Sequence, residues 1–137
     1  MFQSPLAELD NVFLAPHIGG STLEAQQNIG MEVADKLVKY SDNGSTISAV
    51  NFPEVSLPTQ NSDIRRILHI HENKPGVMRA INRVVSEHDV NIEGQFLRTL
   101  TNIGYVVIDM NSTEETSRSL LHQLKAIDGT LRSRILF

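Results

Sequence analysis

The sequence predicts an α+β protein in which a ferredoxin-like βαββαβ unit, residues 64–137, follows a long helix. Such a unit has a four-stranded antiparallel sheet with two helices on one face. Three observations lead to this prediction. From residue 65 onward, stretches with strand periodicity and stretches with helix periodicity follow one another in the order β, α, β, β, α, β. Residues 21–42 carry an apolar stripe at every fourth position, and residues 45–63 have no sustained period.

The first helix is predicted over residues 22–42, after a short apolar run, residues 12–15, that Pro16 interrupts. Ser21 and Glu24 have the spacing of a capping box, in which each side chain satisfies a free backbone N–H at the helix start. The apolar stripe consists of Ala25, Ile29, Val33 and Leu37. Because residues 1–63 offer this stripe no partner surface, we expect it to be exposed.

Residues 45–63, "STISAVNFPEVSLPTQNSD", are predicted to be a linker. They follow Gly44, a helix-stop signal, and hold two prolines among small polar residues. We place the domain boundary near residues 55–64. The chain then divides into residues 1–20 and 21–63, two remnants of other domains, and the compact unit 64–137.

The compact unit begins with "RRILHIHE", residues 65–72, which alternates as a strand does. Leu68 and Ile70 share one face, whereas Ile67, His69 and His71 share the other. Pro75 is predicted to open a helix that runs to about His88, since proline is tolerated in the first turn. Its apolar face consists of Val77, Ile81, Val84 and Val85.

A hairpin is predicted next, from "VNIEGQFLRTL" and "GYVVIDM" joined by a turn at "TNIG". The expected faces are Val90, Ile92 and Phe96 on the first strand and Val106, Ile108 and Met110 on the second. Ser112 and Glu115 resemble a second capping box. The helix that follows has the stripe Leu120, Leu121, Leu124 and Ile127 and ends at Asp128-Gly129; a last alternating strand, "TLRSRILF", closes the unit.

One face of this sheet has no predicted helix and should be open. A unit of this size buries only about 60% of its unfolded surface. Covering the open face or an edge strand would therefore stabilise it, and dimerisation is the simplest cover.

Composition excludes several classes of function. The chain is 40% apolar and 20% charged and has no apolar run long enough for a membrane helix or a secretory signal, so we expect a cytoplasmic protein without membrane contact. It has no cysteine, which excludes disulfides and thiol chemistry. A net charge of −4 with scattered cations argues against nucleic-acid binding. His69 and His71 lack further ligands at suitable spacing, so no metal site is predicted.

Several stretches together carry a family resemblance. "APHIGGST", residues 15–22, then "HIHENKPGV", residues 69–77, and "VNIEGQ", residues 90–95, resemble the carboxyl-terminal third of the bacterial, serine-inhibited D-3-phosphoglycerate dehydrogenases of the D-2-hydroxyacid dehydrogenase family. The βαββαβ unit resembles their ACT regulatory domain. This resemblance implies that the chain is the tail of a larger NAD-dependent enzyme, a homotetramer that carries out the first step of L-serine biosynthesis from 3-phosphoglycerate.

The resemblance assigns His17 the family's catalytic role, in which a histidine accepts the proton of the substrate hydroxyl as hydride moves to NAD. Imidazole suits this role because its ordinary pKa lies near working pH. The family's carboxylate and arginine partners have no counterpart here, and no glycines have the G-x-G spacing of a dinucleotide site. We therefore expect no cofactor and no activity from this chain alone. Gly19 and Gly20 resemble the family's interdomain hinge.

The resemblance also predicts an L-serine site between two ACT domains, formed by His71 and Asn73 of one chain and Asn91 of the other. Gly76, next to Pro75, would allow backbone N–H groups at a helix N-terminus to reach the ligand carboxylate. Neutral amide and imidazole groups suit an amino-acid zwitterion because they both donate and accept hydrogen bonds. A polar turn that caps a helix is the plain alternative for "HENKPG". The other functions that the sequence leaves open are a free-standing ACT module for amino-acid binding or protein interaction, an enzyme active as it stands, and an RNA-recognition fold, which shares the element order.

Overall fold

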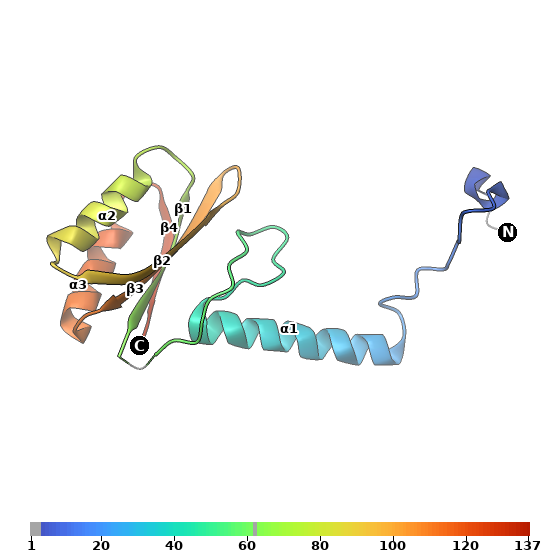
Figure 1. The fold of residues 1–137 in the computed structure, drawn as a ribbon, viewed down its shortest axis with the longest axis horizontal. Helices are drawn as coiled ribbons and strands as arrows, with labels where there is room; N and C mark the ends of the chain where they lie inside the picture. The colour runs from blue at the N-terminus through green and yellow to red at the C-terminus, as the bar shows by residue number, and fades with distance from the viewer. Residues whose placement is uncertain (1–3, 62) are drawn as a thin grey trace. The chain divides into compact units, whose positions relative to one another are not determined.

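The computed structural model describes residues 4–61 and 63–137 (Figure 1). They divide into two units, one up to Asp35 and one from Lys36 to Phe137. The elements are η1 (Pro5–Glu8), α1 (Leu23–Asn43), β1 (Arg65–Glu72), α2 (Val77–Glu87), β2 (Asn91–Thr99), β3 (Ile103–Asn111), α3 (Glu114–Lys125) and β4 (Thr130–Leu136). The predicted order βαββαβ is confirmed. Among the described residues, no helix is both long and apolar enough to cross a membrane.

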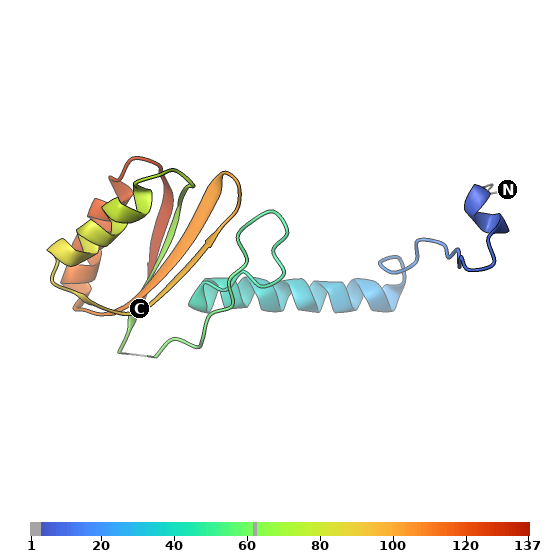
Figure 2. The ribbon, with the colours of Figure 1, turned by 45° about the horizontal axis from the view of Figure 1, so that its top comes forward.

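The four strands form one sheet in the order β2-β3-β1-β4, with every neighbouring pair antiparallel. Helices α2 and α3 lie side by side on one face of it (Figures 1 and 2). The predicted inward faces of β1, β3 and both helices meet there in the main core: Ile67, Val77, Ile81, Val84, Val85, Val106, Ile108, Met110, Leu120 and Leu124. The ferredoxin-like fold class is therefore as expected.

The second face of the sheet is not open, so that prediction was wrong. Val55 and Leu57 of the expected linker are buried against Leu68, Tyr105 and Val107, and Phe52 packs beside them. Residues 45–61 form no helix or strand, as expected of a linker. Their few apolar side chains nevertheless cover the sheet, because an exposed apolar strand face gains free energy from any apolar cover.

The end of α1 is held to the sheet by polar side chains. Arg66 is buried in a two-pronged ion pair with Asp109, at 2.6 and 2.7 Å, and its Nη1 donates to the carbonyls of Asn43 and Pro58 at 3.0 Å. The Tyr105 hydroxyl donates to the Gly44 carbonyl at 2.7 Å. The last carbonyls of a helix have no partner within it, and positive charge is favourable at that end.

A second guanidinium adds to this arrangement. Arg134 Nη2 donates to the carbonyls of Tyr40 and Ser41 at 2.9 and 3.0 Å. Side chains from β1, β3 and β4 therefore satisfy the carbonyls at the end of α1. That residues 1–20 and 21–63 are remnants of two other domains stays a prediction.

Strand β2 contains a bulge that the sequence pattern did not predict. Ile92 pairs with Met110 and Gly94 with Asp109, so Glu93 has no partner on β3. The extra residue reverses the side-chain alternation beyond it. Ile92 therefore packs on the main core, whereas Phe96, which we expected on the same side, packs on the second face.

Both predicted capping boxes begin one residue too early. The α1 cap is Thr22, whose hydroxyl accepts from the backbone N–H of Ala25 at 3.1 Å. The α3 cap is Thr113, which accepts from Thr116 at 3.2 Å. In each case the neighbouring serine bonds elsewhere: Ser21 Oγ to the His17 carbonyl and Ser112 Oγ to Ser117 Oγ. In each Ser-Thr pair the threonine directly precedes the first residue of the helix and is therefore the N-cap.

Two other boundaries shift by a residue or two. Pro75 lies in the turn before α2 rather than in its first turn, and Gly76, with φ of 93°, is the cap residue. The hairpin closes through the Leu100 N–H and the Ile103 carbonyl, so Ile103 already belongs to β3. The expected exposure of the α1 stripe is confirmed for Ile29, Val33 and Leu37, which are 44%, 50% and 64% exposed, whereas Ala25 is half-buried.

Candidate ligand-binding site

The predicted site begins at the end of β1 with His71. Its side chain is 2% exposed, and its ring lies so close to Gly104 on β3 that an added Cβ there would be 2.6 Å from Cε1. Among the described residues, His71 Nδ1 has no partner that meets normal hydrogen-bond geometry, although the backbone of His69 lies near enough to the ring to oppose the lowering of its pKa. Burial lowers the pKa of His71, so the ring is neutral near pH 7. A buried ring nitrogen without a partner is costly, and a ligand that reaches it would recover that free energy.

His69 supports this position from the same strand face. Its ring centroid is 5.6 Å from that of His71, and its Nδ1 is 2.6 Å from Ser133 Oγ. Burial, followed by the charge of His71, lowers the pKa of His69 to about 4. Burial therefore disfavours the charged form of both neighbouring imidazoles.

Asn73 lies in the loop after β1 and is tied to the hairpin turn. Its Nδ2 donates to the Leu100 carbonyl at 3.0 Å and its backbone N–H to the Asn102 carbonyl at 3.1 Å. Asn73 is exposed, so its side chain can meet a ligand from outside the chain.

Gly76 follows in the same loop, at the amino end of α2. It borders a hollow of about 230 Å³ that is lined in part by Lys74, Ala80 and Asp128. Glu72 and Lys74 form an exposed ion pair at 2.5 Å, which raises the pKa of Lys74. An added Cβ at Gly76 would meet no atom, so the positive φ alone favours glycine there.

Asn91 lies at the other end of the sheet. Asn91, on β2, pairs with Asn111 of β3. Glu72, the last residue of β1, pairs with Ile103 of β3. Asn111 and Ile103 are the two ends of β3, a nine-residue strand, which spans roughly 25 Å at about 3.3 Å per residue. One chain therefore brings His71, Asn73 and Gly76 together but does not bring Asn91 to them.

The side-chain amide of Asn91 is occupied by a residue that the sequence analysis missed. Asn91 Nδ2 donates to Glu93 Oε1 at 3.2 Å. Gly104 was missed as well, although a glycine inside a strand is a known sign of close approach by another group. The bulge at Glu93 was missed too, although Gly94 beside it is a glycine inside a strand, which often marks a bulge.

The three residues predicted from the catalytic domains lie in the first unit. His17 is exposed, and its backbone carbonyl accepts from Ser21 Oγ at 3.2 Å. An added Cβ would meet nothing at Gly19 and only Ile29 Cδ1, at 3.8 Å, at Gly20. Their catalytic and hinge roles stay predictions.

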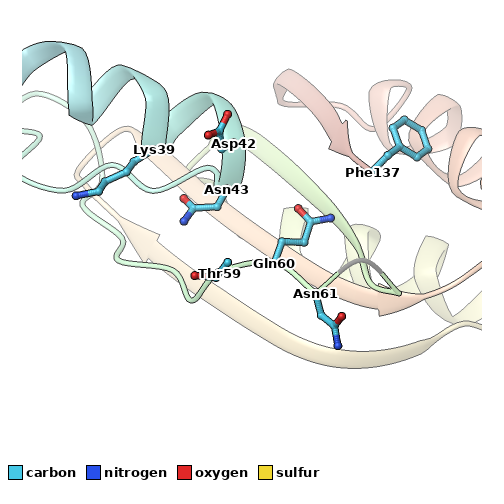
Figure 3. A pocket seen from close by; sticks show the side chains of 7 residues that line it. All are labelled: Lys39, Asp42, Asn43, Thr59, Gln60, Asn61 and Phe137. Carbon is cyan, nitrogen blue, oxygen red and sulfur yellow. The ribbon is translucent and has the colours of Figure 1, made fainter.

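A second hollow, of about 450 Å³, lies apart from these residues, where the end of α1 faces the segment before β1. Figure 3 shows its mostly polar lining: Lys39, Asp42, Asn43, Thr59, Gln60, Asn61 and Phe137. Gln60 is held there by bonds from its Nε2 to the carbonyls of Ile64 and Leu136. Over residues 4–61 and 63–137, no three histidines or carboxylates are grouped so that they could hold a metal ion.

Comparison with known proteins finds one family model and several relatives that this chain resembles. Residues 67–132 match the family model described as an AHAS small subunit-like ACT domain. Over 136 residues, 99% of the chain, the sequence is 60% identical to D-3-phosphoglycerate dehydrogenase of Escherichia coli K12 and 57% identical to that of Haemophilus influenzae. It is 41% identical over the same length to D-3-phosphoglycerate dehydrogenase of Dictyostelium discoideum. The chain spans about a third of each relative, 33%, 32% and 32%.

Proposed function

We propose that this chain binds L-serine between two copies of itself. The basis is its similarity to the C-terminal region of D-3-phosphoglycerate dehydrogenases and its match to an ACT-like domain. In the full enzyme this binding would serve as feedback inhibition of the pathway that makes serine. The observation that carries the proposal is the separation of Asn73 and Asn91, which lie at opposite ends of one sheet.

Pairing of two β2 strands would bring these residues together. β2 is an edge strand, so its free backbone groups can pair with a second copy. Two-fold symmetry makes such a pair antiparallel, and the first residue of one β2 then lies beside the last residues of the other. Asn73 bonds to the Leu100 carbonyl directly after β2. Asn91 of one copy therefore comes next to Asn73 of the other, and pairing through β4 would leave them apart.

The chemistry of the assembled site suits an amino acid. Asn73 and Asn91 offer carbonyl oxygens to an ammonium group and amide N–H groups to a carboxylate or hydroxyl. The buried His71 Nδ1 adds a further unsatisfied group. Backbone N–H groups at the amino end of α2, next to Gly76, favour an anionic group such as the ligand carboxylate.

The catalytic part of the proposal concerns the full enzyme. There His17 would exchange the proton of the substrate hydroxyl while NAD, held by domains outside this chain, takes the hydride. We expect this chain alone to show no NADH turnover with phosphohydroxypyruvate. Activity that depended on His17 would contradict this account. We also expect the enzyme to work in the cytoplasm as a homotetramer.

Thermal unfolding with and without L-serine tests the regulatory proposal. At 100 times the dissociation constant, specific binding adds about 2.7 kcal/mol of stability and raises the midpoint by several degrees. Glycine, L-alanine and L-threonine at the same concentration should raise it less. Asn91→Ala should remove the serine shift, whereas Asn51→Ala, an exposed asparagine in the loop before Phe52, should keep it. A full shift in Asn91→Ala would contradict the proposed site, and an equal response to all four amino acids would favour a general amino-acid-binding module.

A further inference from the structure

The orientation of the Asn91 side chain is set by Glu93. Asn91 Nδ2 donates to Glu93 Oε1 at 3.2 Å. Asn91 and Glu93 are two positions apart in β2, and residues at this spacing lie on the same face of a strand. Glu93 also lies at the bulge, where Ile92 and Gly94 pair with successive residues of β3 and Glu93 pairs with none.

The contact fixes which end of the amide is available. A carboxylate only accepts hydrogen bonds, so the nitrogen of Asn91 must face Glu93 and the carbonyl oxygen must face away from it. That oxygen is an acceptor suited to an ammonium group. The carboxylate of Glu93 adds a negative charge beside it, and a negative charge attracts an ammonium group but repels a carboxylate.

We propose that Glu93 selects for effectors that carry an α-ammonium group, both by orienting Asn91 and by placing a negative charge at that end of the site. This inference rests on the proposed serine site between two chains. Glu93 is exposed and belongs to neither core cluster, so we expect variants at this position to fold. The ligand is then a small amino acid, and the site does not bind the analogue of that amino acid in which a hydroxyl replaces the ammonium group.

L-Serine and L-glycerate, which differ only in that group, provide the test. Calorimetric titration of each into the wild-type chain should detect serine and not glycerate. Glu93→Ala and Glu93→Gln should each weaken serine binding by about fivefold or more, as expected for the loss of a charge-assisted contact near the surface. Both variants should also lower the ratio of the glycerate dissociation constant to the serine dissociation constant. Glu115→Gln, an exposed carboxylate in the first turn of α3, is the matched control and should bind like the wild type. Thermal unfolding without ligand checks that each variant folds.

The outcomes separate the two proposals. If Asn91→Ala loses serine binding while both Glu93 variants keep it within twofold, the serine site stands and the inference about Glu93 is overturned. If Glu93→Gln binds like the wild type and only Glu93→Ala is weak, charge selection is overturned. If the wild-type chain does not bind serine, or if Asn91→Ala binds it normally, the proposed site fails and the inference about Glu93 fails with it.

Discussion

Replacing Gly44 by alanine tests how closely the end of α1 packs on the sheet. Gly44 has φ of 82°, a left-handed conformation that costs an L-residue about 1–2 kcal/mol. An added Cβ would lie 2.9 Å from the Tyr105 hydroxyl, closer than real Cβ atoms approach, and 3.0 Å from Leu68 Cδ1, closer than most do. Overpacking of this kind costs about 1–3 kcal/mol. We therefore expect Gly44→Ala to lower the free energy of unfolding by about 2–5 kcal/mol.

Gly76→Ala separates the two causes of this loss. Gly76 has φ of 93°, but an added Cβ there would meet no atom, so only the backbone cost applies. Urea unfolding of both variants at one protein concentration gives the comparison, because any dimerisation makes stability depend on concentration. A Gly44→Ala variant no less stable than Gly76→Ala would refute the packing described for the second face of the sheet.

Two further variants follow from the buried polar groups. The pKa of His69 is lowered from 6.5 to about 4 in the folded chain. As pH falls, the unfolded chain therefore binds a proton at this residue at a higher pH than the folded chain does. The resulting stability is fully present above pH 6.5 and is lost as pH falls toward 4. His69→Gln, which does not titrate, should lose less thermal stability between pH 7 and pH 4.5 than the wild type, and an equal loss in both would contradict this reasoning. Arg66→Met leaves the carboxylate of Asp109 buried without its partner and should cost about 3–5 kcal/mol in urea unfolding, whereas Arg66→Met with Asp109→Leu should recover part of the loss. No recovery in the double variant would show that the carboxylate is not the cause.

The helices and strands of the compact unit could be predicted because their apolar periods are clean. Ile67 with His69 and His71, and Val106 with Ile108 and Met110, alternate without interruption, and the structure places each set on one face. The pattern failed for Phe96 because the bulge at Glu93 changes the face on which the following side chains lie. Gly94 inside the strand was the only local sign of that bulge, and a glycine there does not by itself fix the register with the neighbouring strand.

The cover on the second face was missed for a similar reason. Val55 and Leu57 stand among prolines and polar residues, where two isolated apolar residues give no period. The ion pair of Arg66 with Asp109 joins residues on two strands, and nothing near either residue indicates the other. Contacts between residues far apart in sequence are therefore where the sequence was least informative.

For the candidate site, the resemblance selected residues that the sequence alone could only describe as a polar turn. The structure adds the buried, unpartnered Nδ1 of His71 and the distance along the sheet from Asn73 to Asn91. Local pattern could not provide either observation. Because one chain does not bring Asn73 and Asn91 together, the proposed serine site needs two chains, and this is the central claim of the proposal.

Mixing two inactive variants tests that claim most directly. Asn73→Ala removes one half of each shared site and Asn91→Ala removes the other, so neither homodimer should bind L-serine. In a mixed dimer, one site loses both residues and the other keeps both. Calorimetric titration of an equal mixture, after exchange of subunits, should therefore recover about a quarter of the wild-type serine sites. No recovery in a mixture shown to contain mixed dimers would contradict a site shared between two chains.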